Sequence, residues 1–159
     1  MIEYLPLVLT GLGLTASILY YTITLRNANK TRQAQFLMQI YNKFDTSEKQ
    51  NAYTEVLNWE WRTFDEFWKK YSITEKPEAW KDLLSLLMFY EGLGTLIKTR
   101  KLPIDDIYLM MGGLSIMLWE KFVPIFDSIR DRMDYPRFAS ETEYLYIELV
   151  KYRDQHPKL

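Results

Sequence analysis

Two glutamates in apolar stretches of the sequence are its best candidates for a chemical site. Glu91 is the only carboxylate between Asp82 and Lys98, in a segment made almost entirely of apolar residues. Glu120 follows a tryptophan in the next apolar stretch. A carboxylate buried without a partner is strongly unfavourable, so each glutamate must find a hydrogen-bond donor or bind a proton. Both are therefore predicted buried polar residues.

Two interpretations of these glutamates remain open. In the functional one, Glu91 and Glu120 form a carboxylate pair for acid–base chemistry, or half of a carboxylate metal site. In the structural one, Glu91 joins two helices by bonding to a tyrosine or an arginine. Metal sites in helical bundles commonly use Glu-x-x-His repeats, but the single histidine, His156, lies in a polar tail. We favour the structural interpretation and predict no catalytic residue, no metal site and no cofactor.

Composition excludes several other classes of site. The chain of 159 residues has no cysteine, which rules out disulfides, thiolate metal sites and cysteine nucleophiles. It also has no glycine-rich phosphate loop and no serine nucleophile elbow. Of its 20 basic and 21 acidic residues, only Glu3 precedes Arg26. The rest of the chain is therefore neutral, whereas a nucleic-acid-binding protein usually has a basic excess.

The elements that must position the glutamates begin with an uncharged segment over residues 4–25. These 22 residues, at about 1.5 Å per residue in a helix, match the roughly 30 Å hydrocarbon core of a bilayer. Tyr4, Tyr20 and Tyr21 are placed to lie in the headgroup zones. A cleaved secretory signal would carry its positive charges before the apolar run, not after it. We therefore predict a transmembrane anchor over residues 1–25.

The charges beside this segment predict its orientation. Arg26, Lys30 and Arg32 follow it within seven residues, while Glu3 precedes it. Cytoplasmic flanks carry the excess of Lys and Arg, which places the N-terminus outside the cell membrane and the remaining chain in the cytoplasm. The same three charges could attract anionic lipid, although a role as a topology signal is favoured. Gly13 and Ser17 have a spacing that would let two such helices associate.

The remaining chain has helical periodicity throughout, and we predict an all-α fold. The first helix should continue without a break from the membrane to Phe44. The following helices are expected at about 46–59, from Thr63 to about 71, from about 77 to 99, from about 105 to 132 with bends at Gly112–Gly113 and Pro124, and at about 138–154. Asp45 with Glu48, and Thr63 with Glu66, have the spacing of N-terminal caps. Residues 26–154 would then form a cytoplasmic bundle of about five to six helices, followed by a polar tail over residues 155–159.

Aromatic residues gather at the second and third of these helices: Trp59, Trp61, Phe64, Phe67 and Trp68. Such a cluster could be a docking surface, but aromatic residues at helical spacing more often form a core. We favour the core. Gly92 and Gly94 lie within the helix of Glu91, where close helix packing would explain them.

Three stretches of the sequence resemble a known family: the uncharged segment leading into TRQAQFLMQIYNKF, the stretch FYEGLGTLIKTRKLPIDDIYLMMGG, and LWEKFVPIF. They are similar to an uncharacterised family of small prokaryotic membrane proteins. The resemblance implies one membrane span and a cytoplasmic helical domain of unknown function, and it supplies no catalytic residues.

These observations predict a membrane-tethered interaction module or accessory subunit rather than an enzyme. Its partners would be the lipid bilayer and either another protein or a second copy of the chain, with no nucleic acid. The alternative is a membrane-bound enzyme or ligand sensor with a carboxylate site near Glu91 and Glu120. A third possibility is a sensor of anionic lipid surfaces that uses Arg26, Lys30 and Arg32.

Overall fold

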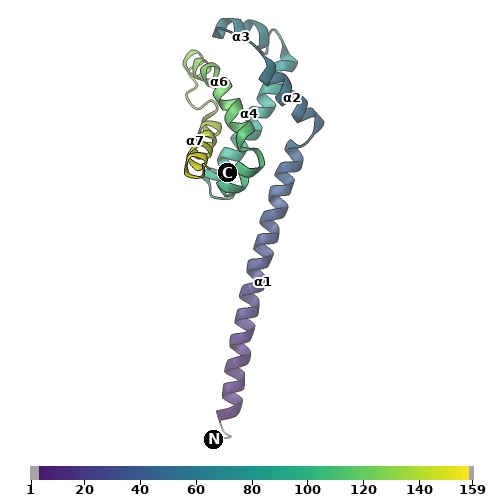
Figure 1. Ribbon diagram of the computed structural model, residues 1–159, viewed down its shortest axis with the longest axis vertical. Coiled ribbons are helices and arrows are strands. Elements are labelled where there is room, and N and C mark those ends of the chain that lie inside the picture. Colours follow the sequence, from purple (N-terminus) through teal and green to yellow (C-terminus); the bar gives the residue numbers. More distant parts are fainter. Residues whose placement is uncertain (1–3, 158–159) are drawn as a thin grey trace. The chain divides into compact units, whose positions relative to one another are not determined.

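The computed structural model describes residues 4–157 and divides the chain into two compact units, Met1–Lys43 and Phe44–Leu159. Every regular element within the described residues is helical, which confirms the predicted all-α class (Figure 1). The sequence-based division after residue 25 follows hydropathy, whereas the division after Lys43 follows packing.

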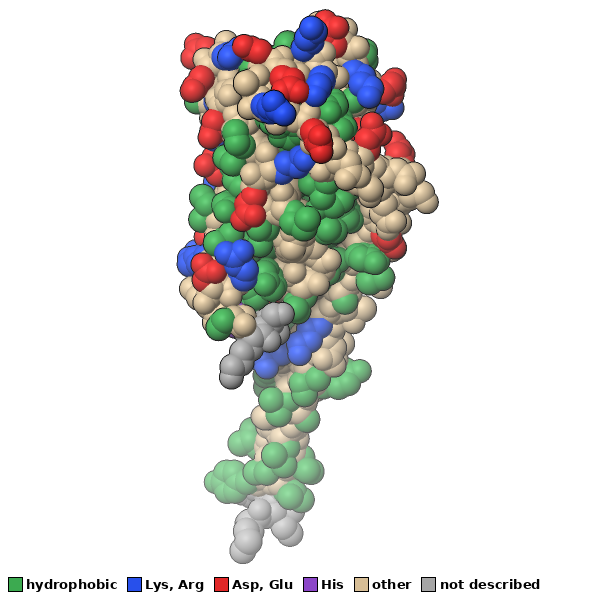
Figure 2. Space-filling view, turned by 45° about the horizontal axis from the view of Figure 1, so that its top comes forward, with side chains coloured by type: hydrophobic (Ala, Val, Ile, Leu, Met, Phe, Trp, Pro, Cys, Tyr) green, Lys and Arg blue, Asp and Glu red, His purple; other side chains and the backbone are tan. Residues whose placement is uncertain are grey.

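Helix α1, Leu5–Phe44, is one uninterrupted element of 40 residues. Its predicted continuation to Phe44 is confirmed, and at about 1.5 Å per residue it is roughly 60 Å long. The hydroxyls of Thr10 and Thr15 donate to the carbonyls four residues earlier, at 2.8 and 2.9 Å, so these polar side chains are satisfied within the helix. The N-terminal part of α1 shows only apolar and uncharged surface in Figure 2.

Seven elements follow in the second unit: α2 Ser47–Asn58, α3 Phe64–Tyr71, α4 Pro77–Lys98, α5 Ile104–Ile107, the π-helical turn η2 Tyr108–Gly112, α6 Gly113–Arg132 and α7 Ser140–Gln155. The cap predicted at Thr63 is confirmed, because its side chain accepts from the N–H of Glu66. The cap predicted at Asp45 is wrong. Thr46 caps α2 instead, accepting from the N–H of Lys49.

The predicted bend at Gly112–Gly113 corresponds to a local break in the helical backbone. Met111 has φ −151° and ψ 16°, outside the helical region, within the π-helical turn. A β-carbon at Gly112 would lie 2.8 Å from the Tyr108 ring, so a larger residue would displace that ring. Pro124, the other predicted bend, lies inside the continuous helix α6.

Aromatic side chains fill the core between α2, α3 and α6. The Phe122 ring lies 5.1 to 6.3 Å from the rings of Trp59, Trp61 and Phe67. Trp59 is 5% exposed, and Phe67 and Phe122 are fully buried. The core interpretation of the aromatic cluster is thus confirmed for Trp59 and Phe67, whereas Trp61, Phe64 and Trp68 are only half-buried.

Helix α7 packs against α4 and α6 (Figure 1). At Gly94 the backbones of α4 and α7 approach so closely that a β-carbon on Gly94 would lie 1.9 Å from the carbonyl oxygen of Glu141. Close packing therefore explains Gly94, as predicted. The same explanation is wrong for Gly92, where nothing lies within 4 Å of such a carbon.

Two helical stretches among the described residues are long and apolar enough to cross a membrane: Leu5–Phe44 and Ile104–Arg132. Both stretches qualify by length and composition, and the core helix of a soluble protein can qualify in the same way. The apolar window of the first stretch is 0% buried within the structure, whereas that of the second is 50% buried.

Candidate functional site

The carboxylate of Glu91 is half-buried and satisfied by a single residue of α7. Its Oε1 accepts from the backbone N–H of Thr142 at 2.7 Å and from the Thr142 hydroxyl at 2.8 Å. The partner is thus a threonine, and the expectation of a tyrosine or an arginine is wrong. The helix of Glu91 is also less enclosed than its sequence suggests, since Met88 is 72% exposed.

This contact completes the start of helix α7. The residue at the N-cap position is Ala139, which has no side-chain acceptor and adopts a left-handed backbone with φ 57°. An N-cap side chain normally accepts from the second or third N–H of its helix, and Thr142 is the third residue of α7. Glu91 therefore supplies from α4 the acceptor that α7 lacks, and its negative charge suits a helix N-terminus.

Glu120 does not join Glu91 in a site. The side chain is exposed, so the prediction that Glu120 is partly buried is wrong. Among residues 4–157 its one side-chain hydrogen bond is long, 3.5 Å from the donating hydroxyl of Tyr146 to its Oε1. Within residues 4–157, no group of three or more His, Asp or Glu side chains is arranged to hold a metal ion.

The residues predicted to lie at the membrane surface are all exposed, on α1 or, for Tyr4, directly before it. Tyr4, Tyr20 and Tyr21 are 65 to 73% exposed, and Arg26, Lys30 and Arg32 are likewise exposed. Helical geometry places Arg26 and Lys30, four residues apart, on one side of α1.

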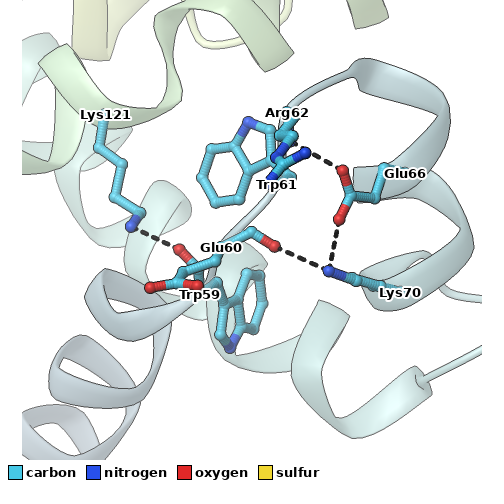
Figure 3. Close-up of a pocket in the computed structure, with 7 residues that line it drawn as sticks. All are labelled: Trp59, Glu60, Trp61, Arg62, Glu66, Lys70 and Lys121. Atoms are coloured by element: carbon cyan, nitrogen blue, oxygen red, sulfur yellow. Dashed lines mark hydrogen bonds and ion pairs between the residues drawn. The ribbon is translucent and has the colours of Figure 1, made fainter.

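A surface cavity of about 700 Å³ lies at the connector between α2 and α3, residues 59–63 (Figure 3). Side chains hold the backbone of this connector. Glu66 Oε2 accepts from the N–H of Arg62 at 2.9 Å, and Lys70 Nζ donates to the carbonyl of Glu60 at 3.2 Å. Lys70 also pairs with Glu66 Oε1 at 2.6 Å. These contacts lower the pKa of Glu66, chiefly through the hydrogen bond from Lys70.

Lys121 enters the same cavity from α6. Its ammonium donates to the carbonyls of Leu57 and Trp59, both at 2.7 Å, and lies 4.9 Å from the centre of the Trp61 ring. A cation at these carbonyls suits the C-terminal end of α2. Burial lowers the pKa of Lys121, and the negative charge of Glu60 opposes this effect.

Two buried phenols lie between α2, α4 and the start of α6. The Tyr53 hydroxyl donates to the carbonyl of Leu114 at 3.0 Å, and burial raises its pKa to about 12. The Tyr90 hydroxyl is fully buried, and no group within residues 4–157 lies in hydrogen-bonding geometry to it. The Ser115 hydroxyl beside it donates to the Met111 carbonyl at 2.9 Å. Burial, and then the neighbouring Tyr53, raise the pKa of Tyr90.

The sequence interpretation overlooked Lys121 although a signal for it exists. Lys121 lies three residues after Leu118 and four before Ile125, both of which are buried. It therefore falls on the buried stripe of α6, where a lysine needs a polar partner. The partners come from α2 and its connector, which periodicity in α6 does not reveal.

Comparison with known proteins gives one match. No curated protein and no solved structure matches the chain. A family model matches residues 7–149, which include most of the uncharged segment as well as the helical unit. Since this match covers well over half of the sequence, the chain belongs to the family described as Domain of unknown function (DUF4760).

Proposed function

We propose that the chain is a membrane-tethered helical module that acts by binding a protein partner or a second copy of itself, and not by catalysis. The observation that carries this proposal is the N-terminal part of α1. Residues 4–25 carry no charge, and the large apolar side chains from Leu5 to Leu25 are 45 to 72% exposed. Exposing so many apolar side chains to water is strongly unfavourable, and a bilayer removes that cost.

The proposal includes one membrane span and not two. The second apolar stretch contributes Leu118, Phe122 and Ile129 to the core of the second unit, where each is 0 to 1% exposed. Moving these side chains into lipid would remove the packing partners of Trp59 and Phe67. In the proposed topology the N-terminus is outside the cell membrane and the second unit is in the cytoplasm, in line with Arg26, Lys30 and Arg32.

The contact at Glu91 supports a structural role for this residue over a catalytic one. Its Oε1 accepts two hydrogen bonds from Thr142, while Glu120 is exposed on another helix. The proposed role of Glu91 is therefore to hold α7 on α4.

Single-cysteine labelling tests the anchor and its orientation, since the chain has no cysteine of its own. Tyr4→Cys should react with a membrane-impermeant maleimide on intact cells. Glu78→Cys, at the exposed start of α4, should react only after lysis. Both variants should stay in the membrane fraction after alkaline carbonate extraction. Release by carbonate would overturn the anchor, and the reverse labelling pattern would overturn the orientation.

Cross-linking in native membranes tests the binding role. Glu78→Cys and His156→Cys, both exposed, provide attachment points for a photoactivated cross-linker. A discrete adduct, with this chain or with one other protein, is expected. If only uncross-linked chain is recovered at every cross-linker length and in several growth conditions, the binding role is wrong.

A further inference from the structure

The cavity at the connector between α2 and α3 has the size of a ligand site. Its volume of about 700 Å³ lies within the range of about 300 to 1,000 Å³ typical of small-molecule pockets. Indole rings from Trp59 and Trp61 form part of its wall, together with charged side chains from the connector, α3 and α6 (Figure 3). Side-chain hydrogen bonds hold the connector on both sides, so its backbone is preorganised.

The positive charge of Lys121 is incompletely compensated within this cavity. Lys121 is half-buried, and no carboxylate within residues 4–157 forms an ion pair with it. Two backbone carbonyls accept from its ammonium, but an ammonium has three donors. The third N–H has no hydrogen-bond acceptor within residues 4–157, although the ammonium lies 4.9 Å from the centre of the Trp61 ring. Partly buried charges are normally paired with an opposite charge.

The other charges of the cavity leave an excess of donors. Arg62 and Lys70 bring two further cations, whereas the two acids are Glu60 and Glu66. Both oxygens of Glu66 are occupied, one by Lys70 and one by the backbone of Arg62. Figure 3 shows the ammonium groups of Lys70 and Lys121 pointing toward the connector from opposite sides. The cavity thus holds three cationic side chains against two carboxylates, and only the Glu66 carboxylate is occupied by the connector and α3.

We propose that this cavity binds a small oxyanion, a carboxylate or a phosphate group, which pairs with Lys121 and is held at the rim by Arg62. The oxyanion accepts the remaining N–H of Lys121 while the two backbone carbonyls stay bound. Any apolar part of the ligand lies against the Trp61 indole. Burial lowers the pKa of Lys121, and the charge of Glu60 offsets this effect only in part. The site does not depend on membrane attachment.

The competing explanation is that Lys121 only closes the C-terminal end of α2. In that case anions only screen the surface charges of the protein, and the cavity does not bind them. The two explanations differ in whether an anion saturates the site at constant ionic strength.

Titration of the full chain in an uncharged detergent distinguishes them. Inorganic phosphate and succinate are the two probes, each balanced against chloride at constant ionic strength. Tryptophan fluorescence and calorimetry follow binding, because Trp61 lies beside Lys121. We expect saturable binding of at least one probe with one site per chain, and the probe that binds identifies the oxyanion class. No saturable binding of either probe overturns the proposal.

Three variants locate the site. Lys121→Met should weaken binding about tenfold or more, as expected for the loss of a charged hydrogen bond. Arg62→Gln should weaken it several-fold. The Arg62 side chain is exposed and makes no hydrogen bond or ion pair within residues 4–157, so this variant tests the site even if Lys121→Met fails to fold. Lys81→Met, an exposed lysine on α4, is the matched control and should bind as the wild type does. Unchanged affinity in Arg62→Gln or in a folded Lys121→Met variant contradicts the proposal.

Discussion

At the scale of single residues, the bond between Glu91 and Thr142 gives the clearest stability prediction. Glu91→Ala removes the acceptor at the start of α7, and no residue of α7 replaces it. The expected loss is about 1–3 kcal/mol, the range for a lost cap together with unpaired donors. Glu91→Gln retains an acceptor oxygen and should cost less. Chemical denaturation followed by circular dichroism measures both.

Glu120→Ala is the matched control for Glu91, because Glu120 is exposed and has one contact of 3.5 Å. It should change the free energy of unfolding by less than about 0.5 kcal/mol, as surface substitutions usually do. Equal effects of the two alanine substitutions would show that the Glu91 acceptor at the start of α7 does not contribute to the free energy of unfolding.

Tyr53 makes a second residue-scale prediction, for alkaline pH. Its pKa rises from 10.0 to about 12 on folding, because burial disfavours the charged phenolate. The folded state therefore holds this proton where the unfolded state has lost it. The contribution is fully present below pH 10 and is lost as the pH rises toward 12. The full loss is about 2–3 kcal/mol.

Comparison of the wild type with Tyr53→Phe isolates this effect from other alkaline titrations. The variant should lose less stability between neutral and strongly alkaline pH, although Tyr90 still contributes in the same direction. Tyr135→Phe, an exposed ring, serves as the control and should retain the wild-type decline. The interpretation is wrong if Tyr53→Phe declines as steeply as the wild type.

At the scale of elements, the contact between α4 and α7 predicts opposite effects of one substitution at two nearby glycines. Gly94→Ala places a β-carbon 1.9 Å from the Glu141 carbonyl, so α7 must move; the expected cost is about 1–3 kcal/mol. Gly92→Ala meets nothing within 4 Å and should stabilise α4 by about 0.5–1 kcal/mol through helix propensity. Thermal midpoints measured in parallel should move in opposite directions. A shared direction would contradict the close approach at Gly94.

The helices themselves could be predicted because their signals are local. Thr63 with Glu66 marks the start of α3, and the periodicity of α1 reaches Phe44, where the helix ends. Partners across the fold could not be predicted in this way, since Glu91 and Thr142 are 51 residues apart in sequence. The sequence also did not reveal that α7 lacks a side-chain cap, because the predicted helix at about 138–154 includes Ala139, which the structure places at the N-cap.

Lys121 shows the same limit for the candidate ligand site. Its position on the buried stripe of α6 is readable from the spacing to Leu118 and Ile125. The carbonyls of Leu57 and Trp59 that receive it lie more than 60 residues away in sequence. A cavity formed by a connector and two helices depends on how those elements pack, and hydrophobic periodicity determines only which face of each helix is buried.

At the scale of the whole molecule, the division after Lys43 predicts that residues 44–159 fold without α1. This unit has its own aromatic core around Phe122, and Phe44 belongs to it: its ring lies 5.2 Å from Phe89 and 6.3 Å from Tyr53. A fragment beginning at Phe44 should be soluble without detergent, helical by circular dichroism and cooperative in unfolding. A fragment beginning at Asp45 lacks that buried ring and should be about 3–5 kcal/mol less stable.

The same fragment decides between the two apolar stretches. If Ile104–Arg132 is a core helix, the fragment beginning at Phe44 should leave the membrane fraction entirely, because in the proposed topology α1 alone attaches the chain to the bilayer. Retention in membranes after carbonate extraction would mean that this stretch enters the lipid and that the proposed single span is wrong. Since Leu118, Phe122 and Ile129 are buried together in the second unit, we expect the soluble outcome. Attachment and packing would then belong to separate parts of the chain, so that substitutions in residues 4–25 change membrane retention and leave the unfolding of the second unit unchanged.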